Sequence, residues 1–213
     1  MADRTIHIVD DDAAFRDSLR MMLEAHRFRV FDYASGRQFL DALAGRADCR
    51  DDGCALVDVN MPELDGLALQ GHLKRQGIAM PVIVMTGAAD VPTAVRAMKA
   101  GAVDFIEKPF EAEAVLEAIA AAQGRTPVPA DDDPEVVAFR ARLANLTPRE
   151  REILESVVAG NPTKVIAYDL DISPRTVHVH RARIGGKLEI TGLSNLVRLA
   201  LAAGVEPKSI GRK

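Results

Sequence analysis

The sequence predicts an α/β domain with a parallel sheet, followed by a domain made only of helices. Short β-branched apolar segments alternate five times with segments of helical periodicity, and only helical periodicity follows the Pro-, Gly- and Asp-rich segment QGRTPVPADDDPE. The length of 213 residues suits two domains of roughly 100 residues each. We place the first domain at 1–124, a linker at 125–139 and the second domain at 140–213.

Five buried strands are predicted in the first domain: TIHIV (5–9), RVFDY (29–33), CALVDV (54–59), PVIVM (81–85) and AVDFI (102–106). Residues with helical spacing, such as Phe15, Leu19 and Leu23, lie between them. This alternation is typical of a parallel, doubly wound sheet. Such sheets bind ligands beyond the carboxyl ends of their strands, so the site is expected there.

Four helices are predicted in the second domain, at 148–159, 162–169, 174–187 and about 192–203. Thr147, Thr163, Ser173 and Thr191 are the candidate N-caps, because Ser and Thr oxygens accept bonds from the first helical N–H groups. The short turn DLDIS between the second and third helices indicates a helix-turn-helix. Residues Val177, Ile184 and Leu188 supply the buried stripe of the third helix.

The composition, with 48% hydrophobic and 27% charged residues, is typical of a globular protein. No apolar segment approaches the roughly 18 residues of a membrane span, and the N-terminal segment lacks the features of a signal peptide. We therefore expect a cytoplasmic protein without membrane contact. In that reducing compartment Cys49 and Cys54 are expected to be free thiols.

The two predicted domains carry opposite charge. Residues 1–125 hold 14 basic and 20 acidic side chains, whereas residues 140–213 hold 13 basic and 7 acidic ones. A basic domain suits a polyanion, because the phosphates that it neutralises release counterions. The charge therefore favours a nucleic-acid partner for the second domain.

Carboxylates gather at the carboxyl ends of two predicted strands. Asp10, Asp11 and Asp12 follow the first strand, and Asp58 lies near the end of the third. Several oxygen ligands at one sheet edge suit Mg²⁺, which shares its coordination with waters and phosphoryl groups. Each aspartate taken singly could instead cap a helix.

A hydroxyl and an ammonium complete this predicted site. Thr86 ends the fourth strand and Lys108 follows the fifth. Both can donate hydrogen bonds to the oxygens of a transferred phosphoryl group. Taken singly, Thr86 could merely begin a turn.

The strings VDDD, LVDVNMPELDG and VMTGAADVPTAVRAMKAGAVDFIEKPF resemble the receiver domain of response regulators, whose fold is flavodoxin-like. The resemblance implies that Asp58 is the phosphoacceptor and that Thr86 and Lys108 bind the phosphoryl group. It implies a Mg²⁺ ion held by Asp10, Asp11, Asp58 and the backbone carbonyl of Asn60, with Asp11 as a direct ligand and Asp10 as its partner. It also implies a cis bond between Lys108 and Pro109.

The resemblance further implies a conformational switch. Phosphorylation would draw Thr86 inward, and Phe105 would fill the vacated space. The helix 91–100 and the strand 102–106 would then form the surface through which two receivers pair, including Val91, Val95, Met98, Lys99 and Asp104. Plain core packing is the alternative role for Phe105.

The second domain resembles the four-helix LuxR-type DNA-binding domain, and the whole chain is similar to response regulators of the FixJ subgroup, notably in IAYDLDISPRTVHVHRA. The matching base-contact positions are His178, Val179 and Ala182. The candidate phosphate contacts are Lys164, Arg175, Thr176, His180, Arg181 and Lys187, although a basic helix face can also be merely solvated. His178 and the Gly185–Gly186 pair depart from the subgroup, which leaves the target sequence open. Residues two apart do not share a face of a helix, which argues against a metal site at HVH (178–180).

We therefore expect a transcription regulator rather than an enzyme. A sensor histidine kinase would phosphorylate Asp58, and the paired protein would bind promoter DNA, contact RNA polymerase and, by resemblance, activate transcription. Two alternatives stay open: a phosphate sink with vestigial DNA binding, and a constitutive dimer that ignores phosphorylation. The sequence names no sensor, stimulus or operator.

Overall fold

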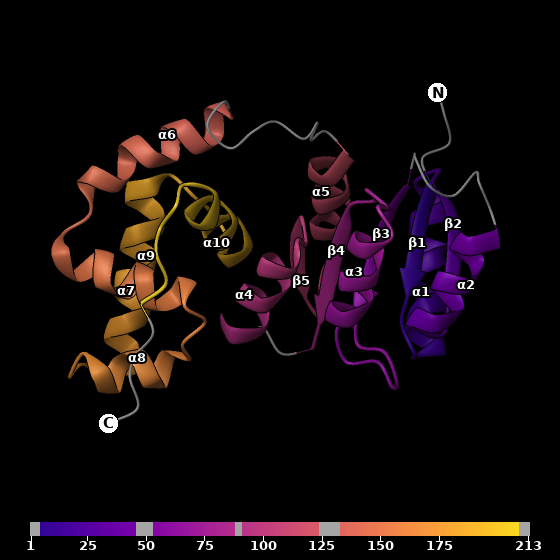
Figure 1. Cartoon of the computed structure of the whole chain (residues 1–213), viewed down its shortest axis with the longest axis horizontal. Coiled ribbons are helices and arrows are strands. Elements are labelled where there is room, and N and C mark those ends of the chain that lie inside the picture. Colours follow the sequence, from indigo (N-terminus) through magenta and orange to yellow (C-terminus); the bar gives the residue numbers. More distant parts are fainter. Residues whose placement is uncertain (1–4, 46–52, 88–90, 124–132, 209–213) are drawn as a thin grey trace. The chain divides into compact units, whose positions relative to one another are not determined.

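The computed structural model describes residues 5–45, 53–87, 91–123 and 133–208 (Figure 1). The contacts between residues group the chain into two compact units. One comprises residues 1–88 and 100–125, and the other comprises residues 89–99 and 126–213. Each unit is described by itself, and α4 (Val91–Ala100), most of which is grouped with the second unit, is given with the strands that it follows in the chain. No helix in the described ranges is long and apolar enough to cross a lipid bilayer.

The first unit is built on a five-stranded parallel sheet with the order β2-β1-β3-β4-β5. The strands are β1 (Thr5–Val9), β2 (Arg29–Tyr33), β3 (Gly53–Asp58), β4 (Val82–Thr86) and β5 (Asp104–Glu107). This order confirms the predicted doubly wound sheet, whose direction of winding reverses between β1 and β3. The carboxyl ends of these two central strands are therefore the expected place for a site.

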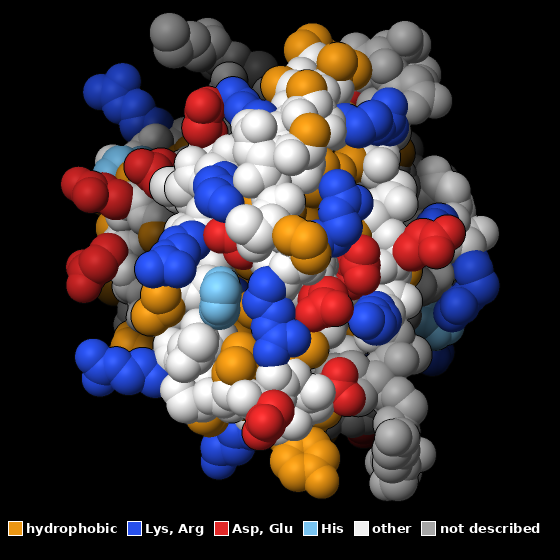
Figure 2. All heavy atoms as spheres, turned by 90° about the vertical axis from the view of Figure 1, so that its left-hand side faces the viewer, with side chains coloured by type: hydrophobic (Ala, Val, Ile, Leu, Met, Phe, Trp, Pro, Cys, Tyr) orange, Lys and Arg blue, Asp and Glu red, His pale blue; other side chains and the backbone are white. Residues whose placement is uncertain are grey.

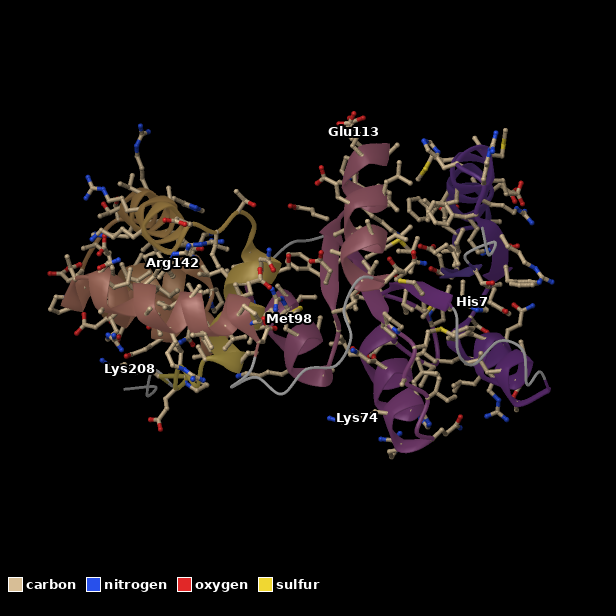
Figure 3. All side chains as sticks on the ribbon, turned by 90° about the horizontal axis from the view of Figure 1, so that it is seen from above. His7, Lys74, Met98, Glu113, Arg142 and Lys208 are labelled. Carbon is tan, nitrogen blue, oxygen red and sulfur yellow. The ribbon has the colours of Figure 1, made fainter. Side chains whose placement is uncertain are left out.

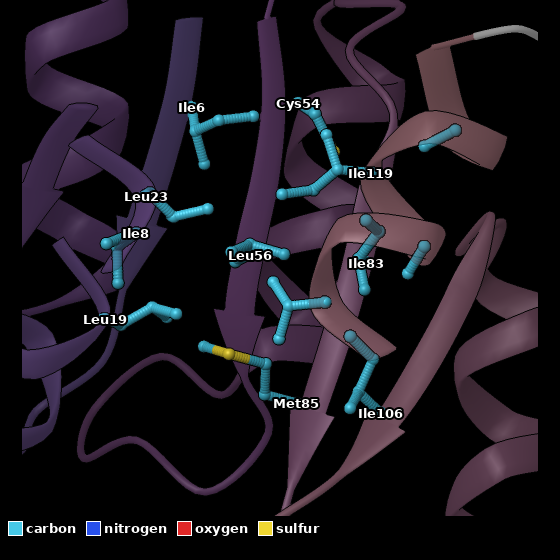
Figure 4. Close-up of a cluster of buried hydrophobic side chains, with 13 residues drawn as sticks. Ile6, Ile8, Leu19, Leu23, Cys54, Leu56, Ile83, Met85, Ile106 and Ile119 are labelled. Atoms are coloured by element: carbon cyan, nitrogen blue, oxygen red, sulfur yellow. The ribbon is translucent and has the colours of Figure 1, made fainter. Parts of the chain in front are cut away.

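Helices follow the strands, as the periodicity predicted. They are α1 (Ala13–Ala25), α2 (Gly36–Gly45), α3 (Gly66–Arg75), α4 (Val91–Ala100) and α5 (Ala112–Gln123). One core cluster joins the strand residues Ile8, Leu56 and Ile83 to Leu23 of α1 and Ile119 of α5 (Figure 4). Burial of these apolar side chains fixes α1 and α5 on one face of the sheet.

Cys54 lies within this core and has a free thiol. Burial raises the pKa of that thiol to about 12, because the uncharged form is favoured away from water. The prediction of a free thiol is thus confirmed for Cys54. Cys49 lies outside the described residues.

The second unit contains α6 (Pro134–Arg142), a short 3₁₀ turn (Leu143–Asn145), α7 (Pro148–Val158), α8 (Thr163–Asp169), α9 (Pro174–Leu188) and α10 (Leu193–Ala202). The last four are the predicted helices. Thr147 and Ser173 accept N-cap bonds, as expected. The other two predicted caps were wrong, since Pro162 and Gly192 occupy the cap positions of α8 and α10.

The segment predicted as a linker is helical from Pro134 onward. Asp133 caps α6, and Val136 and Phe139 are almost fully buried. An ion pair joins Glu135 of α6 to Arg198 of α10. The linker prediction therefore extended too far, because the Pro and Asp residues that suggested a break are also typical of a helix start.

Candidate functional site

Two buried carboxylates and one ammonium meet at the carboxyl edge of the sheet. Asp10 follows β1 and Asp58 ends β3, and the two strands pair directly, with Val9 opposite Val57. The Nζ atom of Lys108 lies 2.5 Å from Oδ2 of Asp10 and 2.8 Å from Oδ1 of Asp58. The structure therefore brings together three of the predicted site residues.

Burial sets the electrostatics of this cluster. Asp10 is 1% exposed and Asp58 is 6% exposed. Burial raises the pKa of Asp10, although the hydrogen bond from Lys108 works in the opposite direction. Burial lowers the pKa of Lys108, but its bonds to Asp10 and Asp58 outweigh that effect and raise it. Lys108 therefore supplies the positive charge that offsets the two carboxylates.

The three consecutive aspartates after β1 have different surroundings. Asp11 is exposed, whereas Asp10 is buried and accepts a bond from the backbone N–H of Asp12 at 2.9 Å. The side chain of Asp12 caps α1 by accepting bonds from the N–H groups of Ala14 and Phe15. The helix-cap alternative thus applies to Asp12, and Asp10 and Asp11 stay available to a ligand.

The backbone beyond β3 is held close to Asp58. The N–H of Asn60 donates to Oδ2 of Asp58 at 2.6 Å. Gly66 begins α3 so near to this turn that a Cβ atom there would lie 2.4 Å from the carbonyl oxygen of Asp58. Glycine is therefore required at 66, a constraint that the sequence reasoning missed although Gly66 directly follows the helix cap Asp65.

Thr86 and Phe105 occupy neighbouring strands behind the carboxylates. Thr86 ends β4, is 1% exposed, and accepts at its backbone carbonyl a 2.7 Å bond from the N–H of Lys108. Phe105 on β5 is half-buried and lies opposite Val84 of β4. The bond between Lys108 and Pro109 is cis, as the resemblance implied.

The residues predicted for pairing lie on α4 and β5. Val91, Val95, Met98 and Lys99 belong to α4, and Asp104 begins β5. Pairing of two receivers through this surface stays a prediction.

Phe15 is a site neighbour that the sequence reasoning placed only in a helical stripe. The ammonium of Lys108 lies 3.9 Å from the centroid of the Phe15 ring, a cation–π distance. Phe110 packs edge-on against the same ring, with centroids 5.7 Å apart. Phe15 therefore contacts Lys108 in addition to its carboxylate partners, and only a predicted contact between α1 and the segment after β5 could have revealed this.

The second unit forms the predicted helix-turn-helix from α8 and α9. Asp171 adopts a left-handed φ of 50° in the turn, and the backbone N–H of Ile172 donates to the carbonyl of Ala167. Val177, Ile184 and Leu188 are fully buried on one stripe of α9, as predicted. That stripe anchors the helix and leaves its exposed side chains available to a partner.

The predicted DNA contacts fall into two groups by exposure. Those with exposed side chains are Lys164, Arg175, His178, Val179 and Ala182, and those that are half-buried are Thr176, His180, Arg181 and Lys187. The face shown in Figure 2 carries Lys and Arg side chains with acidic and hydrophobic ones between them. Five of the predicted contacts are therefore presented to solvent on α8 and α9.

Lys187 has an internal partner instead. Its Nζ atom lies 2.6 Å from a carboxylate oxygen of Glu150, and it also donates to the backbone carbonyl of Asn145. The bond from Lys187, followed by the bonds from Thr147, lowers the pKa of Glu150 from 4.5 to about 2. This pair joins the start of α7 to the end of α9.

A second ion pair secures the end of α9. Arg142 of α6, labelled in Figure 3, lies 2.5 Å from the carboxylate of Glu189. Glu189 itself adopts a left-handed conformation, with φ of 56°, and caps the helix. The end of α9 is therefore fixed by contacts from both α6 and α7.

Comparisons with known proteins agree with both halves of this description. A family model described as "Response regulator receiver domain" matches residues 6–120, and one described as "Bacterial regulatory proteins, luxR family" matches residues 144–200. The chain belongs to the two-component response regulators that join a receiver to a LuxR-type DNA-binding domain. It is a transcription regulator of that family.

Within the family the chain is similar to FixJ proteins. It is 48% identical to the transcriptional regulatory protein FixJ of Rhizobium meliloti (strain 1021), over 97% of this chain and 100% of that protein. It is 39% identical to the response regulator TodT of Pseudomonas putida, over 93% of this chain and 87% of that protein. The crystal structure of full-length FixJ from B. japonicum is 44% identical, covers 96% of this chain and 98% of its own, and gives a TM-score of 0.55.

Proposed function

We propose that Asp58 accepts a phosphoryl group from a sensor histidine kinase in the cytoplasm. The observation that carries the proposal is the contact of Asp58 with Lys108 beside Asp10, at the point where the sheet reverses its winding. An oxygen of Asp58 would attack the phosphorus of a phosphohistidine, the phosphorus–nitrogen bond would break, and the imidazole would recover a proton. Lys108 and Thr86 would then donate to the phosphoryl oxygens.

The residues present fit a Mg²⁺ ion. Receiver domains generally bind Mg²⁺ at the phosphorylation site. Among the described residues no three His, Cys, Asp or Glu side chains gather into a metal cage. Mg²⁺ needs only one or two carboxylates when waters and a phosphoryl group complete its octahedron. Asp10, Asp11, Asp58 and the carbonyl of Asn60 would hold the ion, which would neutralise charge on the phosphoryl group.

We propose that the signal passes from Thr86 and Phe105 to α4 and β5, through which two receivers pair. The receiver would occupy residues 1–124 and the DNA-binding unit would begin with α6 rather than at residue 140. In that unit His178, Val179 and Ala182 would contact base edges, and Val179, 44% exposed, suits a thymine methyl group. Contact with RNA polymerase and activation of transcription belong to the same proposal.

Lys164 and Arg175 are the strongest candidates for phosphate contacts, because both are exposed. Thr176 and His180 are half-buried, and the hydroxyl of Thr176 bonds to that of Ser173. The internal pairing of Lys187 and the partial burial of Arg181 argue against a direct role for either in DNA binding.

Phosphorylation with a small-molecule phosphodonor and Mg²⁺ tests the first step. We expect mass spectrometry to locate one phosphoryl group on Asp58 and to find none in Asp58→Asn. Lys108→Met should also lose phosphorylation while it keeps its fold, whereas Lys74→Met, on the exposed end of α3, should be phosphorylated normally. Phosphorylation of Asp11 in preference to Asp58 would contradict the assignment.

A further inference from the structure

A cavity lies in the second unit between α9 and the start of α10. Its volume is about 350 Å³, within the range of small-ligand pockets. His178, Ala182 and Gly186 line it from one face of α9, since residues four apart share a helix face. None of the residues that line it is acidic.

Two neighbouring glycines line this cavity. A Cβ atom on Gly186 would meet nothing within 4 Å, so any larger residue there would extend into free space. A Cβ atom on Gly185 would lie 3.0 Å from the carbonyl oxygen of Ile190, which tightly limits what can replace it. Both glycines lower helix stability, and Gly186 leaves room beside α9.

The cavity contains a cation that lacks a counter-charge. Arg181 lines it, is half-buried, and bonds to no acceptor among the described residues. Burial lowers the pKa of its guanidinium, because the charged form is less favourable away from water. Partly buried charges are normally paired, so this guanidinium favours an anionic ligand.

The start of α10 lies at the same cavity. Gly192 is the N-cap of α10 and gives it no side-chain bond, and the first turn contains no acidic residue. The first N–H groups of a helix have no partner within it and carry partial positive charge. Both Gly192 and Leu193 line the cavity, so the partial positive charge at the start of α10 lies at the same cavity as the guanidinium of Arg181.

The remaining wall is aliphatic, formed by Ile190, Leu193 and Leu196. A phosphate group of DNA would contact only the positive part of such a cavity. We propose that the cavity binds a short aliphatic carboxylic acid. The carboxylate would lie on Arg181 and the start of α10, and the hydrocarbon chain would pack against the three aliphatic side chains.

Binding of such an acid would influence DNA recognition. His178 and Ala182 line the cavity and are also the proposed base contacts, so an occupied cavity would change the surface presented to a major groove. This consequence rests on the proposed function, whereas binding of the acid itself does not.

Isothermal titration of the full chain with sodium butyrate, in the absence of DNA, tests the proposal. We expect a Kd of about 1 mM or tighter. The neutral butyramide should give no binding, because it lacks the charge that Arg181 requires. Arg181→Gln should weaken butyrate binding at least about tenfold. Arg183→Gln, an exposed arginine on the same helix outside the cavity, should leave it unchanged.

Gly186→Leu provides an independent check, because leucine fills the open space and favours helix over glycine. It should abolish butyrate binding while circular dichroism shows a folded protein. Equal binding of butyramide, or an unchanged Kd in both Arg181→Gln and Gly186→Leu, would overturn the proposal. Inorganic phosphate that binds as tightly as butyrate would overturn it too, since the cavity would then be a general phosphate site suited to the DNA backbone.

Discussion

At the scale of single residues, the site depends on close approaches that only a few residue types permit. Lys108 reaches two carboxylates from different strands and packs on the ring of Phe15. Gly66 lets α3 begin against the carbonyl of Asp58. The sequence predicted that the polar side chains at the strand ends lie near one another, because the carboxyl ends of parallel strands meet at one edge of the sheet. Which side chain contacts which was not, since Asp10 and Lys108 lie 98 residues apart.

Gly66→Ala should destabilise the receiver by about 1–3 kcal/mol, because the new methyl group would overlap a backbone oxygen that cannot rotate away. Urea unfolding followed by circular dichroism measures the effect. Gly87→Ala is the matched control, since a Cβ atom there meets nothing within 4 Å. Equal stability of the two variants would show that α3 moves freely away from Asp58.

At the scale of elements, periodicity predicted the strands and helices but not their ends. The fifth strand was predicted from Ala102, yet β5 begins at Asp104, and before it the N–H of Val103 donates to β4, at the carbonyl of Val82. Apolar residues also occur just before a strand, because they too fill the core. The pattern of apolar residues therefore does not mark where the hydrogen-bonded strand begins. The start of α6 was missed for a related reason, since Asp-Pro occurs both in loops and at helix starts.

The ion pair between Glu150 and Lys187 should position α9. Lys187→Met should lower stability by about 1–3 kcal/mol, because it removes a charge-assisted bond from a carboxylate that is 3% exposed. Thermal unfolding monitored at α-helical wavelengths measures this loss. Arg183→Met, at an exposed site on the same helix, should change stability by less than about 0.5 kcal/mol.

The same pair predicts a pH dependence. The pKa of Glu150 is lowered from 4.5 to about 2 in the folded protein, so its contribution is complete above pH 4.5 and is lost as the pH falls toward 2. Glu150→Gln should therefore reduce the difference in stability between pH 7 and pH 3. An identical pH profile in the variant and the wild type, measured by urea unfolding, would refute this role.

The two glycines of α9 should respond differently to alanine. Gly186→Ala should raise stability by about 1 kcal/mol, since it adds a better helix former without a clash. Gly185→Ala should gain less or lose stability, because its methyl group would press on the carbonyl of Ile190. Urea unfolding of the two single variants separates the cases, and equal gains would show that the carbonyl yields.

At the scale of the whole molecule, a receiver and a DNA-binding unit share one chain with opposite charge on its two halves. The division was visible in the sequence because the strands stop where the basic residues begin to predominate. Lys187 illustrates the limit of predictions from charge. Its position on α9 predicted a contact with a DNA phosphate, but the folded protein pairs it with Glu150, 37 residues away. Charge and spacing predict a surface, whereas only the fold shows which charges are already paired.

The central claim is that phosphorylation of Asp58 controls DNA binding. It is tested most directly by the affinity of the full chain for a promoter fragment, with and without phosphodonor and Mg²⁺, in the wild type and Asp58→Asn. We predict that phosphorylation tightens wild-type binding at least about tenfold, a shift of about 1.4 kcal/mol, and leaves Asp58→Asn unchanged. Equal affinity of the phosphorylated and unphosphorylated wild type would contradict the account.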